Sequence, residues 1–236
     1  MMIVCLTSFT TRPERWAELA LALGGTKIVD GGCWQVFALA GGRLAIHTVE
    51  PDHPKAGAQT ISFDVPDLSN FGAVNGVVDG QIREIDMGHG RVLEVTSSPL
   101  PNFFVEEVEG EMTHPGETLV APLFYTPEVQ EGARLIASLG LTARVSSISG
   151  TYVDFADDGV VAVHHGTRGV GPSFEHPDVT ALIEPLQAAG FRATLIDETY
   201  GRTLRVENPD DASVEAEIWI NETQTDLYGY REGLSE

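Results

Sequence analysis

Short apolar strands alternate along this chain with segments in which apolar residues recur every three or four positions. That spacing predicts helices with one buried face. It is followed in the first half by Trp16, Leu19, Ala20 and Leu23, and in the second half by Val129, Ala133, Ile136 and Leu139. Thr11 and Glu14 have the spacing of a capping box, which predicts that Thr11 caps the first helix. Later in the chain, Asp178 is predicted to cap a helix that Pro185 should kink.

The chain contains an internal repeat. The segment from Trp34 to His47 (WQVFALAGGRLAIH) matches the segment from Tyr152 to His164 (YVDFADDGVVAVH) with one gap. Each consists of an apolar strand, a turn with glycine and a second apolar strand, and glycine tolerates the positive φ of a tight turn. Both segments are therefore predicted to be β-hairpins, in which the two histidines are equivalent and the two opening aromatic residues are equivalent.

Each half repeats one order of elements twice. A strand and a helix precede each hairpin, and another strand, a shorter helical segment and two more strands follow it. The chain therefore predicts four β-α-β-β-β type units, with helices outside curled, mostly antiparallel sheets, which is an α+β fold. Residues 97–117 hold five glutamates and no basic residue, a composition typical of a linker. We accordingly expect a first domain with its linker at 1–111 and a second domain at 112–236.

Several segments of the second half together match the closing hairpin of the domains of a known protein family. They are Ala188-Ala189-Gly190-Phe191, Tyr200-Gly201-Arg202 and NPDDASVE at 208–215, and in the first half GRVLE at 90–94 is similar. TISFDVPD at 60–67 matches the strand that starts the second unit in the same family. The pattern resembles the vicinal oxygen chelate superfamily, which includes glyoxalase I, bleomycin-resistance proteins and extradiol dioxygenases. The resemblance implies two tandem glyoxalase/bleomycin-resistance-like domains, each of two β-α-β-β-β type units.

The resemblance also implies where a metal ion would be held. Metal enzymes of the superfamily take a carboxylate from the last strand, matched here by Glu94 and Glu215, and combine it with His, Gln or Glu from other strands. The position that would carry histidine holds Thr60 in the first half and about Gly171 in the second. Because a transition metal needs three or more well-placed protein donors, we expect no cofactor. The alternative is one divalent metal ion on Glu94 or Glu215, with an unusual ligand such as His47 or His164.

Aromatic and charged residues on the predicted strands indicate a cleft for a small molecule. Aromatic residues on the concave sheet face stack on planar ligands in some members of the superfamily, although packing in the core is the other interpretation. The candidate ligand-binding residues are Trp34, His47, Glu94, Tyr152, His164, Glu215 and Trp219. No residue is assigned as catalytic.

Two hypotheses for the function follow from these residues. The first is a metal-independent binding protein similar to the bleomycin-resistance branch, which sequesters an aromatic or cationic small molecule and so confers antibiotic resistance. The alternative is a metal-dependent lyase, isomerase or dioxygenase of the same superfamily.

Charge narrows the possible partners. Lysine and arginine number 14 against 35 aspartates and glutamates, for a formal net charge of −21, which disfavours nucleic acid and anionic membranes as partners. The acidity favours solubility and would also attract a cationic ligand. Two cysteines are too few for a disulfide framework, and no apolar segment has the length of a signal peptide or a membrane span, so we expect a cytoplasmic protein. Since the two halves can pair within one chain, we expect a monomer.

Overall fold

The computed structural model describes residues 2–69, 82–86, 91–108, 116–224 and 230–234. In the first half the elements are β1 (Ile3–Thr10), α1 (Pro13–Ala22), β2 (Thr26–Asp30), β3 (Trp34–Ala38), β4 (Arg43–Thr48), β5 (Gln59–Val65), β6 (Ile82–Asp86), β7 (Arg91–Val95) and β8 (Phe103–Glu107). They form one sheet in the order β2-β3-β4-β1-β5-β8-β7-β6. Strands β1 and β5 pair antiparallel at its centre, with β4 parallel to β1 and β8 parallel to β5. The strand order of the first predicted unit is thus repeated by the second.

The second half has the same order of elements as the first, but each of its two central strands is divided into two shorter strands. Its elements are β9 (Leu119–Val120), β10 (Leu123–Thr126), α2 (Val129–Ser138), β11 (Thr142–Ser147), β12 (Tyr152–Asp157), β13 (Gly159–His165), β14 (Gly169–Gly171), β15 (Ser173–His176), the 3-10 turn η2 (Val179–Leu182), α3 (Ile183–Ala188), β16 (Ala193–Glu198), β17 (Gly201–Val206), the 3-10 turn η3 (Val214–Ala216), β18 (Ile218–Glu222) and β19 (Tyr230–Glu232). Pro122 separates β9 from β10, and Pro172 separates β14 from β15. Proline has no N–H to donate to a ladder, and the strands divide at these points into sheets β14-β10-β13-β12-β11-β19 and β16-β17-β18-β15-β9.

The ends of the helices differ in part from the prediction. Thr11 does not cap α1, because the cap position is Arg12, whose N–H donates to the Thr10 hydroxyl at 2.8 Å. Asp178 does cap the later helical segment, and its carboxylate accepts from the Thr180 N–H at 3.0 Å. The kinked helix predicted there is instead two elements, the 3-10 turn η2 and the short helix α3, and Pro185 lies in the first turn of α3.

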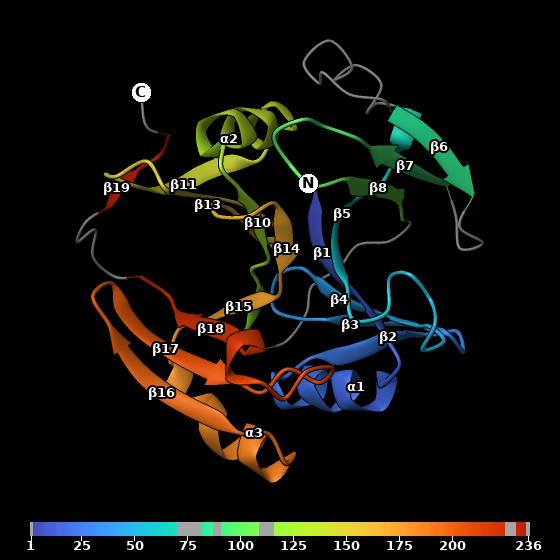
Figure 1. Ribbon diagram of the computed structural model, residues 1–236, viewed down its shortest axis with the longest axis vertical. Coiled ribbons are helices and arrows are strands. Elements are labelled where there is room, and N and C mark those ends of the chain that lie inside the picture. The colour runs from blue at the N-terminus through green and yellow to red at the C-terminus, as the bar shows by residue number, and fades with distance from the viewer. Residues whose placement is uncertain (1, 70–81, 87–90, 109–115, 225–229, 235–236) are drawn as a thin grey trace.

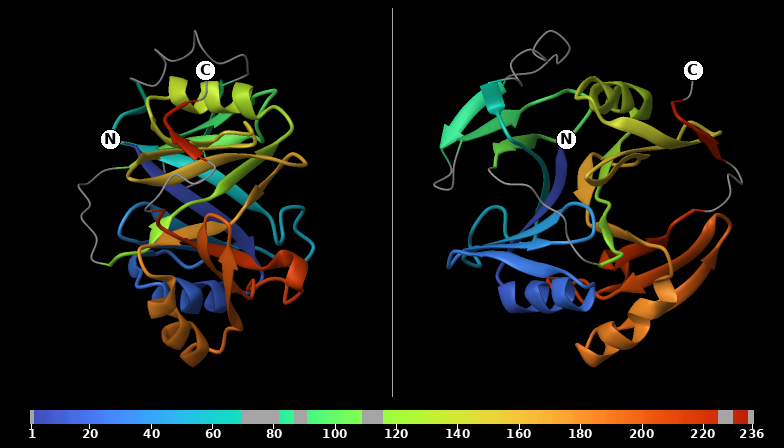
Figure 2. Two further views of the ribbon diagram at one scale, coloured as in Figure 1. Left: turned by 90° about the vertical axis from the view of Figure 1, so that its left-hand side faces the viewer. Right: turned by 180° about the vertical axis from the view of Figure 1, so that it is seen from behind.

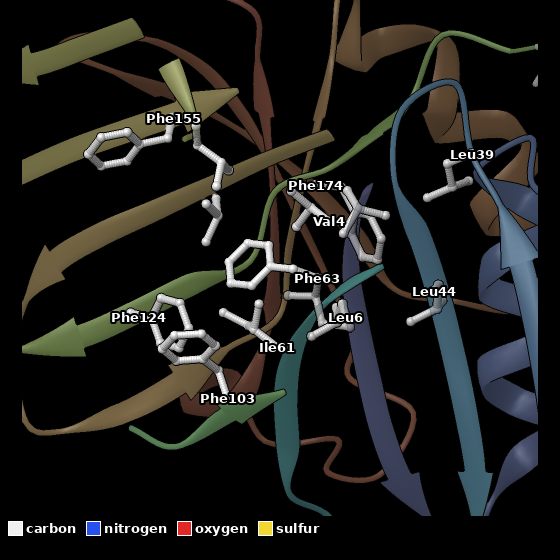
Figure 3. Packing of buried hydrophobic residues seen from close by; sticks show 14 of the residues in the cluster. Val4, Leu6, Leu39, Leu44, Ile61, Phe63, Phe103, Phe124, Phe155 and Phe174 are labelled. Carbon is white, nitrogen blue, oxygen red and sulfur yellow. The ribbon is translucent and has the colours of Figure 1, made fainter. Parts of the chain in front are cut away.

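The helices lie on the outside of the curled sheets, as predicted for an α+β fold (Figure 1 and Figure 2). One hydrophobic core runs through both halves. Where they meet, the rings of Phe63, Phe103 and Phe124 contact one another at centroid distances of 5.6 and 5.8 Å (Figure 3). All three side chains are fully buried. Burial of a phenylalanine side chain contributes about 1.5–3 kcal/mol, so these three rings stabilise the packing of the two halves against each other.

The turns of the two repeated hairpins also join the halves. Asp158 accepts the Gly42 N–H on its side chain and the Val4 N–H on its backbone carbonyl, both at 2.8 Å. A Cβ atom on Gly42, which has φ of 80°, would lie 2.7 Å from the Val4 carbonyl oxygen. Glycine is therefore required there both for the turn and for the close approach. The predicted domain boundary between 111 and 112 lies outside the described residues.

No helix within the described part of the chain has both the length and the apolar character needed to cross a membrane.

Candidate functional site

A cavity of about 660 Å³ lies within the curve of the second half. Its lining comes mostly from strands β10–β13, the β14–β15 region, the segment 208–217 and β18, and the first half adds Gly57 and Gln59. Figure 1 shows how these strands of the second half curve around one another. Side chains alternate between the two faces of a strand, so Leu123 and Tyr125 of β10 face the cavity while Phe124 between them is buried in the core. The two sheets that meet at the central prolines both contribute to the lining, the first with β10 and β13 and the second with β15 and β18.

The strand registers confirm that the two hairpins are equivalent. In the first half Trp34 of β3 is opposite His47 of β4, and in the second Tyr152 of β12 is opposite His164 of β13. In both cases the aromatic ring meets the imidazole edge to face, at 5.5 Å and 5.9 Å between centroids. Only the second pair lines the cavity.

A continuous row of rings forms one wall of the cavity. His164 contacts Tyr125 at 5.6 Å as well as Tyr152, and from Tyr152 the row continues to Tyr230 at 6.0 Å and then to Tyr200 at 6.4 Å. Burial raises the pKa of each of the four phenols above its ordinary value. The tyrosines therefore remain neutral at physiological pH, and they offer ring faces and hydroxyl groups to a ligand.

A charged cluster lies beside this wall. The Arg144 guanidinium donates two hydrogen bonds to Glu175, at 2.7 and 3.0 Å, and one to Asp154 at 2.6 Å. The Tyr152 hydroxyl donates to Asp154 at 3.2 Å. Burial opposes the positive charge of Arg144, but its hydrogen bonds to the two carboxylates keep its pKa above the ordinary value. Both buried carboxylates thus share one arginine as their counter-charge.

Further carboxylates lie at the side of the cavity formed by β18. Glu217 is paired with Arg192 at 3.2 Å and with Arg205 at 2.9 Å. Within the described residues, Asp211 and Glu215 also line the cavity and have no ion pair. Glu215 lies in the 3-10 turn η3, so its predicted place on the last strand is wrong, and the glutamate beside that strand is Glu217.

The donors of the cavity do not fit a metal ion of the family type. Gly171 occupies the position opposite Leu123 at which a histidine would be needed, and a Cβ atom on Gly171 would lie 2.6 Å from the Tyr125 ring. That position holds no side chain because the tyrosine lies over it. The carboxylates of Asp154 and Glu175 are already held by arginine. In the part of the chain that the structure describes, no group of three His, Cys, Asp or Glu side chains could hold a metal ion.

The predicted residues are brought together only in part. Tyr152, His164, Glu215 and Trp219 line the cavity. The other three lie in the first half, away from it: Trp34 and His47 contact each other, and Glu94 accepts a hydrogen bond from Asn102 at 3.0 Å.

The predicted equivalence of Glu94 and Glu215 is wrong. Phe104 and Trp219 are equivalent, because they are opposite Ser62 and Ser173, which have the same place in the two halves. Glu94 is opposite Phe104 in the β7–β8 ladder, and Arg205 is opposite Trp219 in the corresponding β17–β18 ladder. The strand register therefore makes Arg205, and not Glu215, the counterpart of Glu94.

Sequence reasoning missed the charged cluster and most of the aromatic wall. One signal was present, because Ser62-Phe63-Asp64 and Ser173-Phe174-Glu175 repeat the order serine, phenylalanine, acid. In each half the acid is paired with an arginine, Arg43 for the first and Arg144 for the second. The arginines lie on different strands of their units, so the sequence repeat alone does not show the pairing.

Comparison with solved structures agrees with the fold. The chain resembles a catechol 2,3-dioxygenase at a TM-score of 0.62 and 11% identity, covering 99% of this chain and 94% of that one. It resembles the 2,3-dioxygenase LapB from Pseudomonas sp. KL28 at 0.65 and 11%, covering 94% and 91%. It also resembles homoprotocatechuate 2,3-dioxygenase from Brevibacterium fuscum, solved with 3,4-dihydroxyphenylacetate, at 0.63 and 14%, covering 95% and 80%.

These similarities show that the chain shares the fold of these dioxygenases over nearly its whole length, as the resemblance to the vicinal oxygen chelate superfamily predicts. No protein-family model and no curated protein matches the sequence.

Proposed function

We propose that the second half binds a small organic molecule with an aromatic ring or a positive charge, and that binding requires no metal ion. The observation that carries the proposal is the cavity of about 660 Å³ with its row of four tyrosines and a histidine. This volume is within the range of small-molecule sites, which are mostly apolar with a few polar groups that fix orientation. Aromatic ring faces bind planar ligands by stacking and cations by cation–π contact.

The charge of the lining favours a cation over an anion. Among the described residues the lining contains six carboxylates and one guanidinium group, that of Arg144. Arg192, Arg202 and Arg205 pair with these carboxylates from outside the lining. Counting all four arginines against six carboxylates leaves a net charge of −2 at the site. A low-dielectric cavity with excess negative charge attracts cationic ligands.

The structural neighbours favour the alternative of a metal-dependent enzyme, since all of those compared are named as dioxygenases. The side chains of this cavity weigh against that alternative. A ring-cleaving enzyme of that type needs a bound metal ion, and the described residues provide no set of three donors for one. Binding without conversion would make the protein a sequestering agent, as in a resistance role, and we propose that it works as a monomer in the cytoplasm.

The two hypotheses are separated by binding and metal analysis on the same preparation. Protein purified without chelator is analysed for metal content and then titrated with 2-phenylethanol and phenethylammonium by calorimetry, with and without EDTA. We expect both probes to bind and EDTA to have no effect. Stoichiometric Fe, Mn, Zn or Ni, together with probe binding that EDTA abolishes, would overturn the metal-independent proposal.

A charge variant sharpens the test. Glu215 is exposed, lines the cavity and has no cationic partner within the described residues, so Glu215→Gln should fold normally. It should weaken phenethylammonium binding severalfold and leave 2-phenylethanol unaffected. Equal effects on the two probes would show that Glu215 contributes no charge interaction with the ligand.

A further inference from the structure

A lysine of the first half occupies the aromatic face of its own sheet. The Lys55 ammonium lies 4.8 Å from the centroid of the Phe9 ring and 5.4 Å from that of Phe104. Both distances are within the range of a cation–π contact. Phe9 and Phe104 are almost completely buried, and Lys55 is half-buried. The aromatic face formed by Phe9 and Phe104 therefore already binds one ammonium group, that of the flexible Lys55 side chain.

The two phenylalanines have counterparts in the second half. Phe9 is opposite His47 in the β1–β4 ladder, and Tyr125 is opposite His164 in the β10–β13 ladder. The two histidines are equivalent in the repeat, so Tyr125 is the counterpart of Phe9.

The same reasoning applies to the second ring. Phe104 is opposite Ser62 in the β5–β8 ladder, and Trp219 is opposite Ser173 in the β15–β18 ladder. The two serines begin the repeated Ser-Phe-acid segments, so Trp219 is the counterpart of Phe104. Tyr125 and Trp219 both line the cavity, and Trp219 is 37% exposed.

The second half has no counterpart of the lysine. Lys55 belongs to the ten residues 49–58 that join β4 to β5, whereas only the three residues 166–168 join β13 to β14. Backbone hydrogen bonds hold the longer segment on β1, because the Gly57 N–H donates to the Phe9 carbonyl and the Phe9 N–H donates to the Ala58 carbonyl. The first half thus covers its aromatic face with the segment between β4 and β5, whereas the short β13–β14 connection does not cover Tyr125 and Trp219, which line the cavity.

We infer that the cavity of the second half binds a primary ammonium group of its ligand between the rings of Tyr125 and Trp219, at the place that Lys55 fills in the first half. The inference rests on the proposed function and names the class of ligand: an amine whose ammonium group is carried on a short alkyl arm, as in a lysine side chain. Arg205 also lies against Trp219, 5.3 Å from its ring, and pairs there with Glu217 at 2.9 Å. The unpaired carboxylates of the cavity wall complement the ammonium group.

The test compares a cation with a neutral molecule of the same shape. Phenethylammonium and 2-phenylethanol differ in one terminal group, and each is titrated into the full-length protein by calorimetry. A cation–π contact in a shielded site corresponds to about 0.5–2 kcal/mol, so we expect phenethylammonium to bind roughly tenfold more tightly. The lysine side-chain analogue n-butylammonium should compete with it.

Two variants locate the effect. Trp219→Leu removes the ring and should reduce the preference for the cation to about twofold or less, because the contact itself contributes most of that preference. Trp219→Phe keeps a ring face and should retain most of the preference. Since Trp219 is exposed, neither change should prevent folding.

The outcomes distinguish this inference from the proposed function. Equal affinity of the two probes would overturn the ammonium site and leave the binding function intact. A preference for the cation that survives in Trp219→Leu would also overturn the ammonium site at these rings. Failure of both probes to bind would overturn the proposed function and this inference together.

Discussion

Removal of Arg144 leaves two buried carboxylates without a counter-charge. In Arg144→Met the aliphatic part of the side chain is retained, while three hydrogen bonds to Glu175 and Asp154 are lost. The two carboxylate side chains are only 10% and 4% exposed. Loss of one partner from a buried ion pair costs roughly 3–5 kcal/mol, mainly because the remaining charge stays desolvated.

The expected magnitude lies at the lower end of that range. The Arg144 side chain is 32% exposed, so water can enter when it is removed and partly hydrate the carboxylates. We therefore expect the free energy of unfolding to fall by about 3 kcal/mol. For a chain of this size, 1 kcal/mol corresponds to roughly 2–4 °C, so the midpoint of thermal unfolding should fall by about 6–12 °C.

Urea unfolding followed by tryptophan fluorescence measures this change, because Trp16 is fully buried in the native state. Arg134→Met is the matched control, since Arg134 is exposed on α2 and has no ion pair within the described residues; its effect should stay within about 0.5 kcal/mol. Adding Glu175→Gln to Arg144→Met should restore about 1–2 kcal/mol by removing one uncompensated charge. If Arg144→Met matched the control, or if the double variant were no more stable than Arg144→Met, the assignment of Arg144 as the counter-charge would be refuted.

Three further predictions concern the rest of the chain. Burial raises the pKa of Asp64 to about 7 against the opposing effect of Arg43, so its contribution to stability is complete below about pH 4 and is lost as the pH rises through 7. Urea unfolding at several pH values should show this loss in the wild type and not in Asp64→Asn; parallel pH profiles would contradict it. Asp210 accepts the indole N–H of buried Trp16 at 2.8 Å across the two halves, so Asp210→Ala should cost about 1–3 kcal/mol in the same assay, and no loss would show that the contact contributes nothing. Light scattering after size-exclusion chromatography should give a mass near 25.4 kDa, and twice that mass would refute the monomer.

The order of elements and the internal repeat were predicted from the amino-acid sequence alone. Hairpin glycines and three-four apolar spacing are local signals, and they predicted the two hairpins and the two long helices that the structure contains. The match between the segments that end at His47 and His164 also predicted equivalent positions, which the strand registers confirm. Local geometry sets these features, so a single segment of chain carries the information.

Tertiary structure decided which half has an open cavity and which side chains line it. Tyr125, Arg144, Glu175 and Tyr230 come from four different strands, and the pairing of strands and the curling of the sheets bring them to one cavity. Glu94 lies on β7 of the first half, outside this cavity, so its similarity of motif to Glu215 did not predict its place. Long-range pairing of strands depends on the packing of the whole sheet, and no local pattern records it.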